Sequence, residues 1–244
     1  MLFKKKNAEA KIDYSFLHTD MHSHLLPALD DGSPDFDVSV ELIKQLKELG
    51  FKKFITTPHV MWDMYKNSRE IILERMAQLR KRLEEEQVKI EIEAAAEYFI
   101  DDYFESLLKE KHPLLSFGNK LVLVEFSMAS APFDLKKALF EMQIQGYQPV
   151  IAHPERYVYA EANKRFFDEL KESGCFFQLN ALSLSGHYGR SVTKLAHFLL
   201  KNKFYNLIGT DLHHFKHLDA LKTSSVFSSL KKVTEISPVL NPTL

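Results

Sequence analysis

Short apolar runs alternate with longer amphipathic segments along this chain. The apolar runs have the length and the β-branched or aromatic content of strands, and they cover residues 14–20, 51–57, 88–96, 121–124, 149–152, 175–179 and 205–209. Apolar and polar residues alternate within 88–96, whereas 121–124 is apolar throughout, which suits a parallel strand covered on both faces. The pattern therefore predicts seven strands.

The segments between these runs carry apolar residues at the three- and four-residue spacing of helices with one buried face. Helices are predicted over 34–49, 68–86, 101–109, 134–145, 163–172 and 192–202, with a further helical stretch from Leu218 to Leu230. Ser33, which is followed by Pro34, and Ser68 are the predicted N-cap residues of the first two helices.

The two ends of the chain lack such a pattern. Pro238 and Pro242 are expected to end the ordered chain, so residues 236–244 are predicted to be disordered. Residues 1–12 are predicted to form a flexible tail. Residues 13–235 are left as one predicted domain, a size that a single α/β barrel commonly has.

Strands that alternate with helices point to an α/β fold, and seven of them indicate a parallel barrel rather than an open sheet. Right-handed crossovers put the C-terminal end of every strand on one rim, where barrel enzymes carry their active sites. Six of the seven predicted strands end at a His, Glu or Asp residue. That rim is therefore where we expect the chemistry.

Composition narrows the classes of function. Of 244 residues, 32 are Lys or Arg and 33 are Asp or Glu, so the chain lacks the basic balance of a nucleic-acid or anionic-membrane binder. No apolar run approaches the ~20 residues of a membrane span. The one cysteine, Cys175, allows no internal disulfide and fits a reducing compartment. We expect a cytoplasmic protein that neither binds nucleic acid nor inserts into a membrane.

Nine polar residues are expected on the rim of the barrel. They are His22, His24, Asp31, His59, Glu97, Glu125, His153, Asp211 and His213. His22 and His24 are two positions apart in an extended segment, so their side chains share one face. Singly, each residue has a structural interpretation as a helix cap or a hydrogen-bonded histidine. Together, carboxylates and imidazoles at one place suit two or three divalent ions, with Mn, Fe or Zn favoured over Ca or Mg.

Several of these residues stand in motifs that resemble a known family. The motifs are Asp20-Met21-His22-Ser23-His24, Pro58-His59, Glu97, Val124-Glu125-Phe126-Ser127, Ile151-Ala152-His153-Pro154-Glu155-Arg156-Tyr157 and Thr210-Asp211-Leu212-His213. They resemble the PHP (polymerase and histidinol phosphatase) superfamily. Within it they most resemble the bacterial capsule and exopolysaccharide protein-tyrosine phosphatases of the CpsB/CapC/YwqE type.

The resemblance implies a distorted (β/α)7 barrel with a three-metal site, manganese being the expected metal. It implies three ligand sets: His22, His24, Glu97 and Asp211 for the first ion, Glu97, Glu125 and His153 for the second, and Asp31, His59 and His213 for the third. Arg156 matches the phosphate-binding arginine, and Asp211 and His213 are further candidate catalytic residues. The implied reaction is attack of a metal-bound hydroxide on a phosphotyrosine phosphorus. The implied partner is a bacterial tyrosine kinase that controls polysaccharide export.

Other residues allow two interpretations. Met61, Trp62 and Tyr65 would wall a phosphotyrosine pocket or would pack the next loop, and Lys216 offers a cation near the phosphate. Cys175 opens an apolar strand and lacks the Cys-x5-Arg pattern of cysteine-dependent phosphatases, so it is interpreted as a core residue.

Alternative functions stay open at this point. On the same fold, the chain would be a small-molecule phosphoesterase such as a histidinol-phosphate phosphatase, or a nucleotide-cleaving enzyme. In another class, it would be an inactive PHP scaffold that binds a kinase. The complete set of nine polar positions argues against the scaffold. The sequence does not decide between a monomer and a homo-oligomer.

Overall fold

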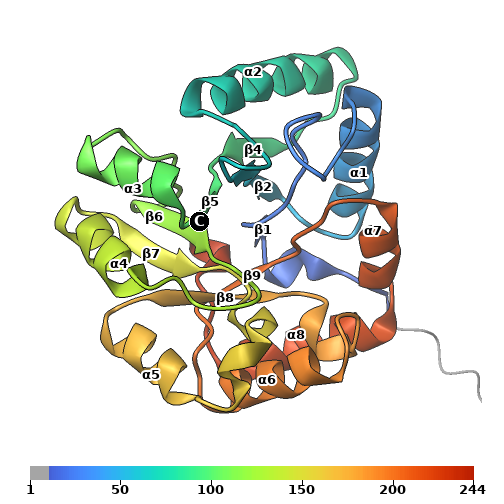
Figure 1. Cartoon of the computed structure of the whole chain (residues 1–244). Helices are drawn as coiled ribbons and strands as arrows, with labels where there is room; N and C mark the ends of the chain where they lie inside the picture. Colours follow the sequence, from blue (N-terminus) through green and yellow to red (C-terminus); the bar gives the residue numbers. More distant parts are fainter. Residues whose placement is uncertain (1–10) are drawn as a thin grey trace, which may run out of the picture.

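The computed structural model describes residues 11–244, and its strands lie inside a circle of helices (Figure 1). The strands are β1 Thr19–Asp20, β2 Lys53–Thr56, β3 His59–Val60, β4 Glu91–Ala94, β5 Glu97–Phe99, β6 Leu121–Glu125, β7 Gln148–Ile151, β8 Phe176–Asn180 and β9 Leu207–Gly209. The α-helices are α1 Phe36–Glu48, α2 Arg69–Glu85, α3 Asp102–Lys109, α4 Leu135–Ile144, α5 Arg165–Glu172, α6 Arg190–Lys201, α7 Phe215–Leu221 and α8 Ser224–Ile236. Short 3₁₀-helices complete the pattern at Tyr14–Phe16, Pro154–Arg156, Val158–Glu161, Ser183–Ser185 and Asn241–Thr243. Among the described helices, none has both the length and the apolar character needed to cross a membrane.

All strand pairs are parallel, in the orders β1-β2-β4 and β3-β5-β6-β7-β8-β9. The first sheet continues into the second, because β2 leads to β3 through Thr57-Pro58 and β4 leads to β5 through Ala95-Ala96. Pro58 has no N–H to donate, which interrupts the ladder. Hydrogen bonds from Ala95 N to Thr56 O (2.9 Å) and from Glu97 N to Pro58 O (3.1 Å) carry the pairing past this point. The nine labelled strands thus form seven continuous paths.

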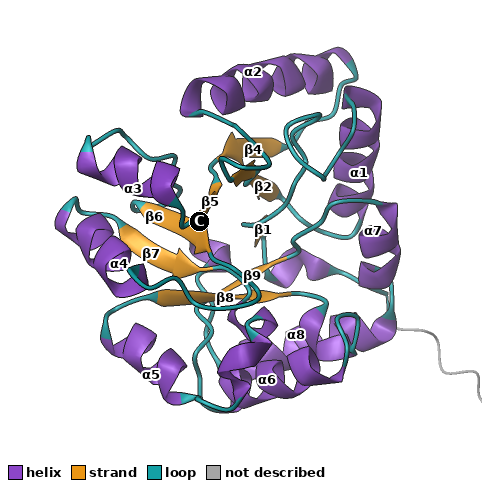
Figure 2. Cartoon of the chain, in the orientation of Figure 1, coloured by secondary structure: helices purple, strands orange, loops and turns teal. Residues whose placement is uncertain are grey.

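The first and last paths meet and close the barrel. Ser23 and Leu212 form a parallel bridge just beyond β1 and β9. His24 N donates to Leu212 O at 2.9 Å, and Asp211 N donates to His22 O at 2.8 Å. The predicted (β/α)7 barrel is therefore confirmed, and Figure 2 shows the strands surrounded by helices.

Two predicted element boundaries are wrong at the start of the chain. The first strand was expected over 14–20, but Tyr14–Phe16 form a 3₁₀-helix that Asp13 caps by accepting a hydrogen bond from Ser15 N. The first long helix is capped by Asp35, whose side chain accepts from Val38 N, rather than by Ser33. Ser33 is instead buried and donates to Asp35 O at 3.0 Å. Ser68 caps α2 as predicted.

The C-terminal end packs against the interior of the barrel and the start of β1, which contradicts the disorder predicted for 236–244. Pro238 follows the end of α8, but the chain then forms the Asn241–Thr243 turn. Asn241 is fully buried, and Leu240 and Leu244 pack against the apolar cluster inside the barrel. These buried contacts outweigh the helix-breaking effect of the prolines. Residues 1–10 of the predicted N-terminal tail lie outside the described residues.

Cys175 is buried beside β8 at 4% exposure, and burial raises the pKa of its thiol to about 12. A thiol with this pKa is not a nucleophile at neutral pH. The interpretation of Cys175 as a core residue is confirmed.

Candidate metal centre

Strand register brings the predicted ligands to one end of the barrel. His59 pairs with Glu97 between β3 and β5, and Phe99 pairs with Glu125 at the C-terminal end of the β5–β6 ladder. His153 directly follows β7. Because the strands are parallel, these side chains emerge at the C-terminal rim, which is where barrel enzymes place their sites.

Glu97 lies at the middle of the group and is fully buried. Its Oε2 is 3.2 Å from His22 Nε2, 3.4 Å from His24 Nε2 and 3.2 Å from His59 Nδ1, and its Oε1 is 3.0 Å from His153 Nε2. Burial alone would raise the pKa of this carboxyl. The surrounding imidazoles outweigh that effect, with His22 and His59 contributing most, and hold the pKa well below its usual value.

Three overlapping groups have ligand atoms within 4.8 Å of one another. They are His24, Asp31, His59 and His213; His22, His24 and Asp211; and His59, Glu97 and Glu125. The groups overlap with the three predicted ligand sets, but His24 and His59 each belong to two of them. His153 Nε2 adjoins the last group, at 3.8 Å from Glu125 Oε2. The structure thus brings all nine predicted residues together, and their division among separate ions stays a prediction.

Several ring nitrogens of the cluster lie where a bound cation would give them a partner. Nδ1 of His59 is buried and makes no hydrogen bond, although Glu125 Oε1 lies 2.9 Å away, because the geometry is not that of a hydrogen bond. His22 Nε2 and His24 Nε2 face each other at 3.2 Å. Buried polar atoms without partners are costly, and mixed imidazole and carboxylate donors fit divalent transition metals.

The electrostatics of the cluster also favour bound cations. Burial would lower the pKa of the His22 imidazolium, but Glu97 and Asp211 raise it to about 9. The Asp31 pKa falls well below its usual value, chiefly because its carboxylate accepts a hydrogen bond from His213. Concentrated negative charge therefore favours the protonated form of His22, and a divalent ion would replace that positive charge.

Two of the predicted ligands have strained backbone conformations. His153 has φ +31° and Asp211 has φ +49°, both in the left-handed region that non-glycine residues rarely adopt. Such residues cost roughly 1–3 kcal/mol each and cluster at functional sites. His153 N donates to Gln178 Oε1 at 3.1 Å, and this bond helps to fix the unusual turn.

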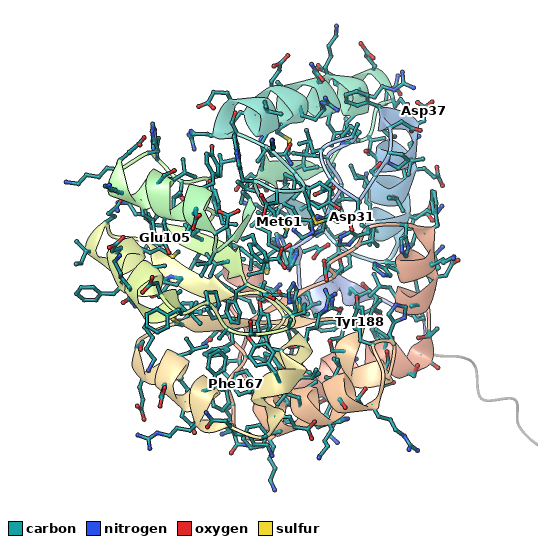
Figure 3. All side chains as sticks on the ribbon, in the orientation of Figure 1. Asp31, Asp37, Met61, Glu105, Phe167 and Tyr188 are labelled. Atoms are coloured by element: carbon teal, nitrogen blue, oxygen red, sulfur yellow. The ribbon has the colours of Figure 1, made fainter. Side chains whose placement is uncertain are left out.

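A cavity of about 650 Å³ opens onto the cluster. Its walls are Asp31, His59, Met61, Met64, Tyr65, Phe99, Glu125, Phe126, Ser127, Met128, His153, Arg156, Tyr188, Asp211, His213, His214 and His217. Asp31, Met61 and Tyr188 come from separate loops and lie toward the middle of the view in Figure 3. Arg156 Nη1 is 3.2 Å from Asp211 Oδ2, and its guanidinium lies 5.0 Å from the centre of the Tyr188 ring.

Two predicted substrate contacts do not line this cavity. Trp62 stacks on Tyr103 at 4.1 Å between ring centres and is 41% exposed, because its backbone N–H is held by Asp101. Lys216 is exposed in the first turn of α7, where His214 and His217 face the cavity instead. The predicted roles of Trp62 and Lys216 are therefore not supported, whereas Met61 and Tyr65 are wall residues.

Sequence reasoning missed four residues that contact the cluster. Asp30 bonds to His24 Nδ1 at 2.8 Å, and Gln178 bonds to His22 Nδ1 at 3.0 Å. Asn180 Nδ2 donates to Asp211 Oδ2 at 2.7 Å, and Tyr188 lies beneath Arg156. One available signal was the place of Asn180 at the end of a strand. The sequence has no pattern that distinguishes Asp30 from its neighbour Asp31.

Comparisons with known proteins agree with this geometry. Residues 18–233 match the family model for capsular polysaccharide synthesis, CpsB/CapC. Tyrosine-protein phosphatase YwqE of Bacillus subtilis (strain 168) is 31% identical over 197 residues, which cover 81% of this chain and 78% of that protein. Tyrosine-protein phosphatase CpsB of Streptococcus pneumoniae is 29% identical over 201 residues, which cover 80% of this chain and 82% of that protein.

Solved structures that resemble this chain also include tyrosine phosphatases. Crystal structures of YwqE from Bacillus subtilis and CpsB from Streptococcus pneumoniae, described as unique metal-dependent tyrosine phosphatases, match with TM-score 0.76 and 27% identity over 91% of this chain and 96% of that chain. Histidinol phosphate phosphatase from Lactococcus lactis, solved with zinc, L-histidinol and phosphate, matches with TM-score 0.54 and 15% identity over 89% and 92% of the two chains, which shows a shared fold. The family match spans every rim residue from His22 to His213, and the chain belongs to the CpsB/CapC family of capsular polysaccharide synthesis.

Proposed function

We propose that this protein is a metal-dependent protein-tyrosine phosphatase that acts on a bacterial tyrosine kinase of capsule or exopolysaccharide synthesis. One observation carries the proposal: six residues of the cluster around Glu97 line the same cavity as Arg156. Relatives named as tyrosine-protein phosphatases share the family and the fold. The site combines cation ligands, a phosphate-binding side chain and room for a substrate.

The side chains that line the cavity suit an aryl phosphate as the substrate. Apolar side chains form one part of its wall, namely Met61, Met64, Tyr65, Phe99 and Met128. The rest of the wall carries Arg156 and six of the metal-ligand candidates. A phosphotyrosine has a charged end and an apolar ring, so it would contact both parts at once. Methionine side chains adapt to aromatic rings through soft, polarizable contacts.

The expected cofactors are two or three divalent ions, with manganese preferred and iron or zinc as alternatives. The residues that would hold them are His22, His24, Asp31, His59, Glu97, Glu125, His153, Asp211 and His213. Ions bound there would neutralise the phosphoryl oxygens and would activate a water molecule as the nucleophile.

The protein's own side chains have separate tasks in this reaction. Arg156 presents its guanidinium fork to two phosphoryl oxygens, a bidentate contact that suits phosphate. Asp211 orients Arg156 through the contact at 3.2 Å. The leaving tyrosinate has a solution pKa of about 10 and departs with little help. His213 lines the cavity, and its Nδ1 lies 2.9 Å from Asp211 O, an arrangement that would hold its Nε2 toward Asp31 and a bound ion.

A substrate panel tests the proposal. The purified protein is assayed at equal manganese with a phosphotyrosine peptide, a phosphoserine peptide of the same sequence, and histidinol phosphate. We expect the phosphotyrosine peptide to give the highest kcat/KM. Preference for histidinol phosphate would identify a small-molecule phosphoesterase, and absence of turnover with all three substrates would identify an inactive scaffold.

A further inference from the structure

The amide of Gln178 lies directly behind His22. Gln178 is fully buried, and its Oε1 accepts from His22 Nδ1 at 3.0 Å and from His153 N at 3.1 Å. Its Nε2 donates to Leu179 O at 2.7 Å. The backbone groups of His153 and Leu179 fix which end of the amide is oxygen. Because this oxygen can only accept, His22 Nδ1 must carry the hydrogen.

The carboxylate of Asp30 has the same relation to His24. Its side chain is fully buried, and Oδ2 accepts from His24 Nδ1 at 2.8 Å and from His59 N at 3.0 Å. Oδ1 accepts from Gly32 N at 3.0 Å. An acceptor that already binds two backbone N–H groups cannot turn away from His24. His24 Nδ1 therefore carries a hydrogen as well.

A glycine makes room for each of these pairs. A Cβ on Gly209 would lie 2.4 Å from His22 Cβ and 2.9 Å from Gln178 Nε2. A Cβ on Gly32 would lie 2.4 Å from His24 Cβ and 3.0 Å from Asp30 Oδ1. Real Cβ atoms do not approach other atoms so closely. Each imidazole is thus held between a glycine and an acceptor for its Nδ1.

In this tautomer the Nε2 atoms of both rings carry no hydrogen and are free to bind a metal ion. With hydrogen on both Nδ1 atoms, the Nε2 atoms of His22 and His24 present lone pairs to each other at 3.2 Å. Asp211 Oδ1 is 3.4 Å from each Nε2, and Glu97 Oε2 lies within the same distance. When both rings are neutral, four electron-rich atoms converge on one point, and one divalent cation would satisfy all four.

We propose that Gln178 and Asp30 are positioning residues that fix His22 and His24 in one tautomer, so that both Nε2 atoms bind the same divalent ion. This inference rests on the proposed metal site. Outer partners of this kind hold the ring orientation and the basicity of a metal-binding histidine, and losing one typically lowers metal affinity 10- to 100-fold.

Manganese binding tests the roles of Gln178 and Asp30 without any substrate. Free Mn²⁺ is measured by electron paramagnetic resonance during titration of the metal-free wild type and the variants Gln178→Met and Asp30→Leu, each of which removes the acceptor for a histidine Nδ1. Each variant is expected to lower the affinity of the tightest ion roughly 10- to 100-fold. Gln178→Glu should stay close to the wild type, because it keeps an oxygen that can accept from His22 Nδ1 and from His153 N.

Two matched variants control for general effects on folding. Gln148→Leu removes a glutamine on β7 that bonds only to backbone carbonyls, at Pro149 and Gly174. Asp101→Leu removes an aspartate that accepts from two backbone N–H groups, at Phe104 and Trp62. Both should bind Mn²⁺ as tightly as the wild type, and circular dichroism of each metal-free variant reports its folding.

The outcomes separate this inference from the proposed function. A wild type that binds no Mn²⁺ would overturn the metal site and the inference together. A wild type that binds Mn²⁺, with Gln178→Met and Asp30→Leu binding it equally well, would overturn the inference alone. An equal loss of affinity in the control variants or in Gln178→Glu would also overturn it, because the loss would then report folding rather than tautomer.

Discussion

Arg156 Nη1 lies 3.2 Å from Asp211 Oδ2, and the other oxygen of this carboxylate is 3.4 Å from the Nε2 atoms of both His22 and His24. One buried carboxylate thus connects the phosphate-binding side chain to the metal-ligand cluster. Asn180 also donates to Asp211 Oδ2, at 2.7 Å. Asp211 therefore keeps a hydrogen-bond partner when Arg156 is removed.

Arg156→Ala is expected to weaken phosphate binding while the metal ions stay bound. A hydrogen bond to a charged group is worth about 1.5–3 kcal/mol, so kcat/KM for p-nitrophenyl phosphate should fall roughly 10- to 100-fold. Arg156→Lys keeps the charge but loses the fork, and we expect an intermediate loss. Steady-state kinetics and metal content by mass spectrometry measure the two effects. Loss of the metal from Arg156→Ala would assign the arginine to metal retention instead.

Removal of metal should abolish activity. The donors around Glu97 supply negative charge and lone pairs, but the described cavity has few cationic side chains to stabilise a transferring phosphoryl group without ions. We expect dialysis against EDTA to stop hydrolysis of p-nitrophenyl phosphate and added Mn²⁺ to restore it. Bound metal should also raise the melting temperature, since it binds only the folded state. Undiminished turnover after chelation would contradict the metal mechanism.

Met128→Ala is expected to reduce the preference for aryl substrates. Met128 lines the apolar part of the cavity, and loss of its contact with a ring would cost about 1 kcal/mol, or roughly fivefold in kcat/KM for a phosphotyrosine peptide. Phe133 lies in the same loop but is fully exposed and does not line the cavity. Phe133→Ala is therefore the matched control and should leave the kinetics unchanged. Equal effects of both variants would place the substrate ring elsewhere.

The sequence was sufficient for much of the fold and for the choice of rim residues. Seven apolar runs identified the barrel, and His, Glu and Asp at the ends of strands identified the rim, because parallel strands share one C-terminal edge. Glu97 is an example: its position after a run of alternating residues was enough to place it beside His59.

The remaining features depend on contacts between distant segments. Gln178 and His22 are 156 positions apart, and no local spacing connects a glutamine within a strand to a histidine on another strand. The sequence left two interpretations of Trp62 open, the wall of the substrate pocket or the packing of a loop, and its stacking on Tyr103 favours the second. Side-chain direction within a loop is set by such contacts, which sequence order does not specify.

Cys175 should be unreactive in the folded protein. Burial raises its pKa to about 12 from the ordinary 9.0, so at pH 9 little of the thiol is ionised in the folded state, whereas about half is ionised in the unfolded chain. Iodoacetamide should therefore modify Cys175 slowly in the native protein and rapidly in urea. Mass spectrometry follows the reaction. Fast native labelling accompanied by loss of activity would require a role for the thiol in the site.

Asn241→Ala should destabilise the barrel without changing the active site. Asn241 joins the two strands at which the barrel closes: Oδ1 accepts from Ile208 N at 2.9 Å, and Nδ2 donates to Thr19 O at 2.9 Å and to Ile208 O at 2.6 Å. Each buried group left without a partner costs about 1–3 kcal/mol, and we expect a total loss of about 3 kcal/mol in the free energy of unfolding.

Urea denaturation measures this change, and Thr243→Ala is the control. Thr243 lies in the same turn, but its hydroxyl bonds only to Leu240 O at an exposed position, so its replacement should cost less than about 0.5 kcal/mol. At temperatures where both variants are folded, Mn²⁺-dependent activity should equal that of the wild type, because Asn241 lies at the opposite end of the barrel from Glu97. An Asn241→Ala variant as stable as the wild type would show that the C-terminal turn does not hold the closure of β1 against β9.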